Sequence, residues 1–226
     1  MNDLKVRRWM GASGLAGFVV FLVALPLYFL GVGPGAQLVD TAQYSSLVTR
    51  TNTFIILRTS IADPLIMVGL LIFLAGLRHL IRKARQEYEW VASLVFGVGV
   101  VVIAVELVGD GLQAGAALDT WVKADPTAVR ALNESSFAMY GAIGLILSAL
   151  LLASAGYATL ATGVLHKWTS WVAYAAAVIS LAAAPSILGG TDITGFYTAS
   201  GYAPFVAQAA MLVWFLVASL SAIKKR

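Results

Sequence analysis

The sequence predicts an all-α protein, a polytopic membrane helix bundle with six transmembrane helices, formed as a single domain over residues 1–226. Three observations lead to this fold class. The chain is 60% hydrophobic and 12% charged, whereas a soluble domain is about 25% charged. Six segments reach the ~20 apolar residues that a membrane helix needs. The basic residues also gather at one end of these segments, as they do on the cytoplasmic side of membrane proteins.

The first three segments each begin at a feature that marks a helix start or a membrane boundary. Met10–Leu30 follows a basic stretch, but its apolar run is too long for a signal peptide and no small-residue cleavage site follows it. Ala62–Ile81 contains Asp63 followed by Pro64, which indicates a kink or a helix start. Trp90–Gly109 begins with tryptophan, a residue that collects at the membrane surface.

The last three segments are delimited in a similar way. Met139–Ala161 follows a polar stretch. Trp168–Leu188 again begins with tryptophan, and Pro185 marks a kink or a frayed end near its close. Pro204–Ile223 starts at a proline, which suits the first turn of a helix, and stops at the basic C-terminal residues. Small residues in the first, fourth and fifth segments let neighbouring backbones approach closely.

The basic residues orient these helices. At one end of the segments lie 11 of the 15 Lys and Arg residues. Because Lys and Arg mark the cytoplasmic side, both termini are predicted to be cytoplasmic, and an even number of helices requires them on one side. The outer connections, at 31–61, 110–138 and 189–203, are long. We expect short helices at Thr41–Ser60 and Pro126–Glu134 within them.

The composition excludes several kinds of chemistry. The chain has no cysteine, which rules out disulfides, thiolate nucleophiles and iron–sulfur clusters, and we expect no cofactor. His79 and His166 lie in basic clusters at the cytoplasmic ends, away from the outer acids. We therefore predict no metal site, with an all-carboxylate Ca²⁺ or Mg²⁺ site left open. The net charge of +4 comes from short clusters at helix ends and does not indicate nucleic acid as a partner.

Two carboxylates near the end of the third segment are the predicted catalytic residues. Glu106 and Asp110 are four residues apart, so they share one helix face. At 1.5 Å per residue, Glu106 lies about 24 Å from Trp90, inside a ~30 Å hydrocarbon core, with Asp110 near its surface. An ionisable residue at that depth is a functional-site hypothesis by default. The alternative is that Glu106 pairs with a buried arginine and Asp110 is a solvated helix end.

A basic residue and a carboxylate lie at the same outer level, and both are predicted to bind a ligand. Arg58 follows the apolar run 54–57, and Asp63 precedes Pro64. We expect Arg58 to pair with Asp63, Glu106 or Asp110, because an unpaired guanidinium at that depth is costly. The pair is either structural or part of a site for an anionic group.

Four further outer residues complete the predicted ligand-binding set: Glu134, Tyr140, Asp192 and Tyr197. Glu134 and Tyr140 are nearly two helical turns apart and are expected to face the same cavity as Glu106. Tyrosines also populate the membrane interface without any further role, which is the alternative for Tyr140 and Tyr197.

The C-terminal half carries a recognisable sequence pattern. It reads RALNESS at 130–136, AAPSILGG at 183–190 and GYAPFVAQ at 201–208, with a His-Lys-Trp turn at 166–168. This pattern resembles a family of uncharacterised bacterial membrane proteins carried as a domain of unknown function. The resemblance covers about the last hundred residues. It implies six spans in a bacterial plasma membrane and implies no activity.

Three functions remain open from the sequence. The leading hypothesis is a bacterial plasma-membrane protein that binds a small lipophilic or amphipathic molecule in an acid-lined outer cavity. If it is an enzyme, it is a membrane-embedded cyclase, isomerase or hydrolase that uses a carboxylate as general acid, since apolar surroundings favour a carboxyl that keeps its proton. The alternatives are a non-catalytic scaffold subunit and a proton- or cation-coupled transporter. The lipid bilayer is the expected partner, and the oligomeric state is not predicted.

Overall fold

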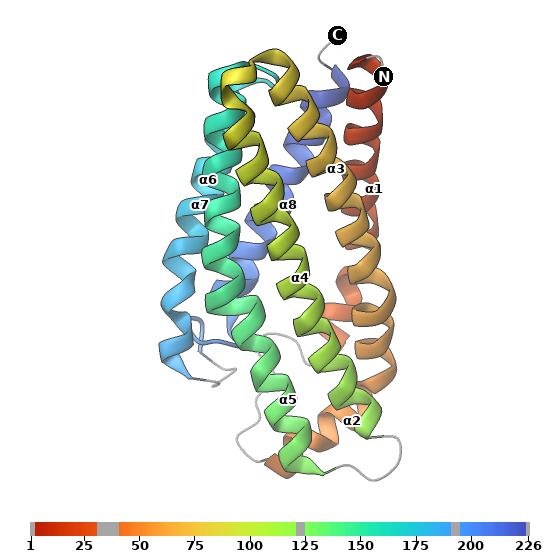
Figure 1. Ribbon diagram of the computed structural model, residues 1–226. Coiled ribbons are helices and arrows are strands. Elements are labelled where there is room, and N and C mark those ends of the chain that lie inside the picture. Colours follow the sequence, from red (N-terminus) through yellow and green to blue (C-terminus); the bar gives the residue numbers. More distant parts are fainter. Residues whose placement is uncertain (1–2, 31–40, 121–124, 191–194, 225–226) are drawn as a thin grey trace.

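The computed structural model describes residues 3–30, 41–120, 125–190 and 195–224, and every regular element in these ranges is helical (Figure 1). Six helical stretches are long and apolar enough to cross a membrane, which confirms the predicted fold class. The α-helices are α1 (Asp3–Leu30), α2 (Thr41–Leu57), α3 (Asp63–Ala84), α4 (Glu89–Asp119), α5 (Pro126–Ala138), α6 (Gly144–Thr162), α7 (Lys167–Ala183) and α8 (Tyr202–Lys224). Shorter elements are the π-helical η1 (Arg58–Ala62) and η3 (Met139–Ile143), and the 3-10 helices η2 (Gln86–Tyr88) and η4 (Ala184–Gly189).

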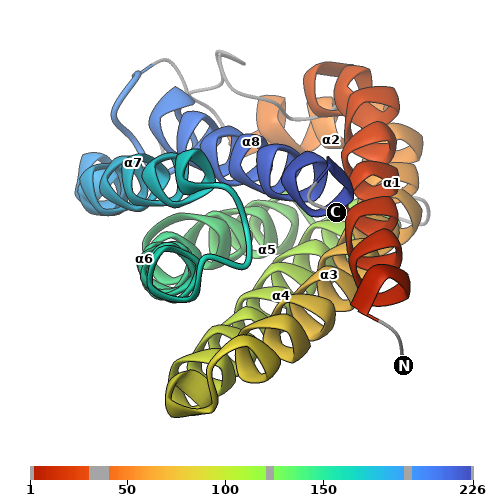
Figure 2. The same ribbon diagram turned by 90° about the horizontal axis from the view of Figure 1, so that it is seen from above.

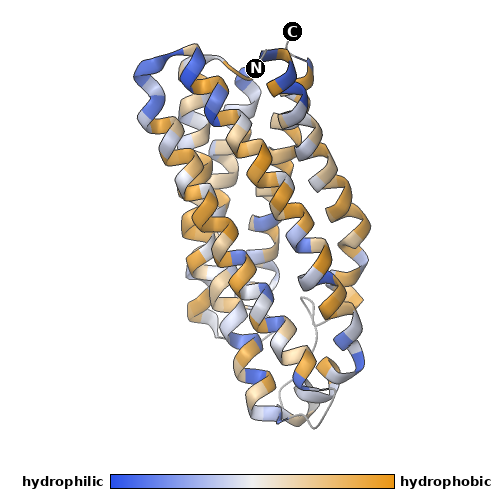
Figure 3. Ribbon diagram, turned by 45° about the vertical axis from the view of Figure 1, so that its right-hand side comes forward, coloured by the Kyte–Doolittle hydropathy of each residue, from blue (hydrophilic) through white to orange (hydrophobic). Residues whose placement is uncertain are grey.

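The six long helices form a ring in chain order. Helix α1 packs against α3, then α3 against α4, α4 against α6, α6 against α7, and α8 closes the ring between α7 and α1 (Figure 2). The core contains an aromatic cluster in which Phe73 packs edge-on against Trp214 and Phe215. Large apolar side chains such as Val23 and Val178 point outward, 75% and 65% exposed. This is the pattern of helices whose outer faces contact lipid. Hydrophobic residues dominate the middle of the bundle (Figure 3).

The outer connections are more helical than the sequence suggested. Helix α4 was expected to end at Gly109, yet it continues to Asp119. Its 31 residues correspond to about 46 Å, longer than the ~30 Å hydrocarbon core. Helices α2 and α5 cover the extra turns, where Ala116 and Ala117 pack against Val48 and Val129. The small alanines allow this close packing, so a stretch predicted as loop forms a helix.

The two predicted short outer helices exist, and each runs into a membrane helix through a π-helical segment. Helix α2 continues through η1 into α3, and α5 continues through η3 into α6. Pro64 does not interrupt the helix, because the preceding residue, Asp63, keeps helical backbone angles (φ −64°, ψ −44°). The wider η1 turn accommodates the missing proline N–H. Asp125 caps α5 by accepting a hydrogen bond from the Thr127 N–H at 2.9 Å, as its position suggested.

Both termini lie at the same end of the bundle, together with the α3–α4 and α6–α7 turns (Figure 1). Trp9, Trp90 and Trp168 lie at this end and are 67%, 66% and 69% exposed. Polar residues gather there as well (Figure 3). Exposed tryptophans beside basic residues are typical of a membrane–water interface. The assignment of this end to the cytoplasm stays a prediction.

Candidate functional site

A cavity of about 120 Å³ opens in the half of the bundle away from the termini. Its walls come from α1, η1, α3, α4, α5, η3 and α8 and from residues 199–201. Three carboxyl residues are buried among the described residues, and all of them line this cavity: Asp63, Glu106 and Asp110. The rest of the lining is mainly apolar and includes Ile66 and Phe205. The cavity therefore collects the buried acids of the described chain in an otherwise apolar setting.

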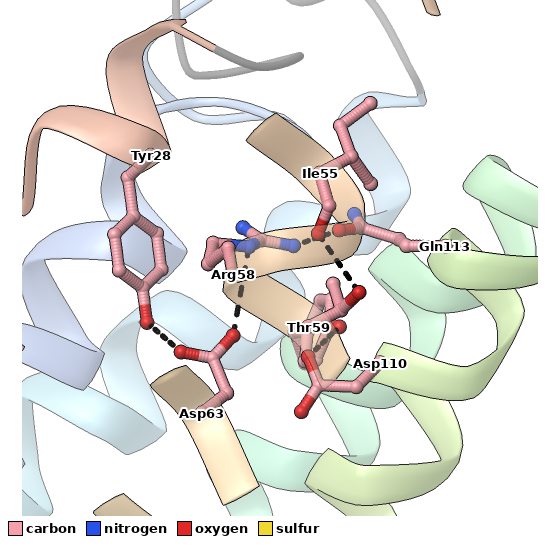
Figure 4. Close-up of polar contacts among 8 residues, drawn as sticks. Tyr28, Ile55, Arg58, Thr59, Asp63, Asp110 and Gln113 are labelled. Carbon is pink, nitrogen blue, oxygen red and sulfur yellow. Dashed lines mark hydrogen bonds and ion pairs between the residues drawn. The ribbon is translucent and has the colours of Figure 1, made fainter. Parts of the chain in front are cut away.

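Arg58 is the cation of the site, and protein groups contact its guanidinium on several sides. Its Nε lies 3.5 Å from Asp63 Oδ2, and its Nη2 donates a hydrogen bond to Gln113 Oε1 (Figure 4). Its guanidinium also lies over the Tyr28 ring, 4.8 Å from the ring centre. The ion pair expected from the sequence thus forms with Asp63, one of the three expected partners. Among the described residues, Arg58 forms its ion pair with Asp63 and its hydrogen bond with Gln113, and not with Glu106.

Each of the two aspartates accepts a hydrogen bond from a tyrosine. Tyr28 donates its hydroxyl hydrogen bond to Asp63 Oδ1, and Tyr140 donates to Asp110 Oδ1 at 2.7 Å (Figure 4 shows both aspartates and Tyr28). Asp63 also forms the ion pair with Arg58, so its negative charge is balanced within the site.

Asp110 is deeper than the sequence suggested. It was expected near the membrane surface, yet its residue is only 4% exposed. The extension of α4 beyond it, covered by α2 and α5, removes it from water.

Glu106 differs from the other acids of the site. It is 7% exposed and lines the cavity. Among the residues that the structure describes, no hydrogen bond or ion pair satisfies its carboxyl group. The space for this carboxyl is provided by Gly144, because a Cβ atom there would lie 3.2 Å from Glu106 Oε1 and 2.6 Å from the Met139 carbonyl oxygen. A buried and unpartnered carboxyl at this depth is costly and calls for an explanation.

Local backbone features position the site on both sides. Arg58 begins η1 and Tyr140 lies in η3, so each π-helical segment contributes a polar side chain to the cavity. Single π-turns inside α-helices are frequent at functional sites. Gly109 lets the Tyr140 ring lie against α4, because a Cβ atom at Gly109 would be 2.9 Å from Tyr140 Cζ. This close approach brings the Tyr140 hydroxyl to Asp110.

The structure brings five of the predicted site residues to the cavity: Arg58, Asp63, Glu106, Asp110 and Tyr140. It also adds lining residues that the sequence reasoning missed, among them Tyr28, Gln113, Ser200 and Gln208. Gln113 could have been found from spacing, because positions 106, 110 and 113 recur on one helix face. Tyr28 resembled an ordinary interfacial tyrosine, and no sequence pattern marked Ser200.

Glu134 and Tyr197 lie elsewhere. Glu134 accepts a hydrogen bond from Arg130 at 2.7 Å in an i,i+4 ion pair, and it does not face the cavity with Tyr140 as expected. Six residues separate the two, which is about 1.7 turns and therefore places them on different helix faces. Tyr197 donates its hydroxyl hydrogen bond to the Ala182 carbonyl and is 47% exposed. The remaining predicted residue, Asp192, lies outside the described residues.

In the described ranges, no group of three or more His, Cys, Asp or Glu side chains converges closely enough to hold a metal ion. Comparisons with protein-family models, with curated proteins and with solved structures find no match. The resemblance to uncharacterised bacterial six-span proteins therefore stays a prediction.

Proposed function

We propose that this membrane protein binds a small lipophilic or amphipathic molecule in the cavity, and that the Glu106 carboxyl engages the polar group of that molecule. The observation that carries this proposal is the unpartnered, buried Glu106 at an apolar wall. Polar groups buried in proteins are nearly always hydrogen-bonded, and the exceptions need a reason. A ligand that supplies the missing partner is such a reason.

Two further orphaned atoms support the same proposal. Ser200 Oγ is buried, has no hydrogen-bond partner among the described residues, and belongs to a residue that lines the cavity. Arg58 Nε is likewise without a hydrogen bond, although it has its ion pair with Asp63. Apolar residues such as Met67, Phe205 and Leu212 complete the wall. A few polar groups in a mainly apolar concavity is the usual composition of a small-molecule site.

Acid catalysis is the extension of this proposal. A carboxyl group that faces a ligand across an apolar cavity is placed to donate a proton to it. Asp110 is less suited to this role because it already accepts a hydrogen bond from Tyr140. Glu106 is thus the acid of a membrane-embedded cyclase, isomerase or hydrolase if the bound molecule is transformed.

The two alternatives fit the geometry less well. A pure scaffold would be expected to satisfy its buried acids internally, as the Arg58–Asp63 ion pair does, and Glu106 has no such partner in the part of the chain that the structure describes. A proton-coupled transporter would be expected to continue its buried ionisable groups toward the terminal end. In the described chain the buried acids stop at the cavity. We further propose a bacterial plasma membrane as the location, on the basis of the sequence resemblance.

The test compares the small molecules that copurify with the wild-type protein and with two variants. Wild type, Glu106→Gln and the control Glu134→Gln are purified in the same detergent, and organic extracts are analysed by mass spectrometry. Glu134 is a carboxylate in the same half of the molecule that does not line the cavity. We expect one small molecule to be enriched in wild type and in the control, and depleted in Glu106→Gln. Identical extracts from all three would favour the scaffold function.

A further inference from the structure

The charges of the cavity specify the kind of ligand, an argument that rests on the proposed function. Arg58 contributes one positive charge. Asp63, its ion-pair partner at 3.5 Å, contributes one negative charge, and these two charges cancel. Asp110 is held by the hydrogen bond from the Tyr140 hydroxyl. Glu106 is therefore the carboxyl that is left to meet the charge of a ligand, and when it is ionised it adds an uncompensated negative charge in an apolar setting.

We propose that the cavity binds a small organic monocation, an amine or a quaternary ammonium, in exchange for one proton on Glu106. Without a ligand, the carboxyl avoids a buried charge by holding a proton. With a cation bound, the ionised carboxylate pairs with it, and the net charge of the site is the same in both states. The exchange is balanced: one cation enters and one proton leaves to solvent.

The lining favours an organic cation over a metal ion. Aromatic residues Tyr28, Phe137, Tyr140 and Phe205 surround the cavity together with apolar side chains. Aromatic faces attract ammonium groups, and the cost of removing such a group from water is low when alkyl groups shield it. The described acids do not converge as metal ligands. The cavity volume of about 120 Å³ suits a cation with a single ring.

The proton exchange depends on the groups that face Glu106. Electrostatic interactions reach it from its own helix, from α3, from η1 and from η3, through the following residues: Asp110, Asp63, Arg58 and Tyr140. Helix α8 contributes Gln208 and Met211 to the same cavity, and neither titrates. Since Arg58 is held by Asp63, Glu106 is the group whose proton a cation displaces. Binding should then weaken as the pH falls, by up to about tenfold per pH unit while Glu106 takes up the proton.

Three probes of the same shape test the charge preference. Benzyltrimethylammonium is the cation, neopentylbenzene is its neutral carbon isostere, and phenylmethanesulfonate is an anion with a similar tetrahedral head. Binding to the full-length protein in nanodiscs is measured by calorimetry, with empty nanodiscs subtracted. We expect the cation to bind at least tenfold more tightly than the other two. Titrations in phosphate and in Tris, which differ in ionisation heat, should report release of about one proton per cation.

The variants separate this inference from the proposed function. In Glu106→Gln the cation should lose at least tenfold in affinity, while neopentylbenzene binds as in wild type and so shows that the cavity is intact. Glu134→Gln should behave as wild type with all three probes. Equal or tighter binding of the neutral or anionic probe would overturn the cation inference and leave the cavity as a ligand site. Cation binding without proton release would overturn the exchange. Failure of all three probes to bind would count against both proposals.

Discussion

At the scale of single residues, the Arg58–Asp63 ion pair is the interaction that makes an acid-rich cavity tolerable inside an apolar bundle. The two side chains are 12% and 7% exposed, so neither is solvated well enough to stand alone. Arg58 also donates to Gln113 and lies over Tyr28, which fixes the guanidinium from three sides. Removing one member of a buried pair leaves an uncompensated charge, which is worse than removing both.

We therefore predict strong coupling between these two positions. Arg58→Ala should lower the free energy of unfolding by about 3–5 kcal/mol, because Asp63 loses its counter-charge. Adding Asp63→Asn should recover at least about 1 kcal/mol of this loss. A double-mutant cycle measures the coupling, with the unfolding free energy of each purified variant obtained by titrating SDS into the detergent solution. The cycle of Arg58→Ala with Glu106→Gln is the control and should show weaker coupling. The reverse order of the two couplings would contradict the pairing seen here.

The sequence located five residues of the cavity because charged residues in apolar segments are conspicuous, and their depth follows from counting residues along a helix. It could not choose the partner of Arg58, since Asp63, Glu106 and Asp110 all lie at a similar level. The choice depends on the rotation of η1 about its axis, and a π-turn changes that rotation by about one residue. The prediction that Glu134 faces the cavity was wrong for a similar reason, because counting residues estimates the depth of a residue and does not determine the direction of its helix face.

At the scale of elements, the site depends on the close approach of α4 and η3. Gly109 has the Tyr140 ring where a side chain would begin, whereas Gly111, two residues later, has open space at that position. Tyr140 in turn reaches Asp110. The sequence predicted the two short outer helices that correspond to α2 and α5, but not the π-turns η1 and η3 that join them to α3 and α6, nor the extension of α4 to Asp119. The outer turns of α4 and α5 contain polar and small residues, which lower the hydropathy by which a membrane helix is recognised.

The two glycines make a matched pair for testing this packing. Gly109→Ala should displace Tyr140 and cost about 1–3 kcal/mol of unfolding free energy, as overpacking does. Gly111→Ala adds the same methyl group into open space and should be neutral or stabilising by up to about 1 kcal/mol, since alanine is the better helix former. Thermal unfolding of both variants in detergent provides the comparison. Equal effects of the two substitutions would show that Tyr140 does not pack against α4.

At the scale of the whole molecule, the ring of six helices has two unlike ends. The end with the termini carries the exposed tryptophans and ion pairs between basic and acidic residues, such as Arg78 with Glu89 at 3.0 Å. The opposite end carries the helical extension formed by α2, α5 and the last turns of α4. The cavity lies toward the extended end, so the orientation in the membrane decides which compartment it serves.

The distribution of basic residues predicts that the terminal end is cytoplasmic and that the cavity lies on the outer side. Since the chain has no cysteine, single cysteines can be introduced without background labelling. Gln86→Cys marks the terminal end and Thr127→Cys the opposite end; both positions are exposed and uncharged, so neither substitution alters the charge balance. In intact cells, a membrane-impermeant thiol reagent should label Thr127→Cys at least tenfold more than Gln86→Cys. After the membranes are opened with detergent, both should be labelled equally. Labelling of Gln86→Cys alone in intact cells would reverse the orientation and place the cavity on the cytoplasmic side.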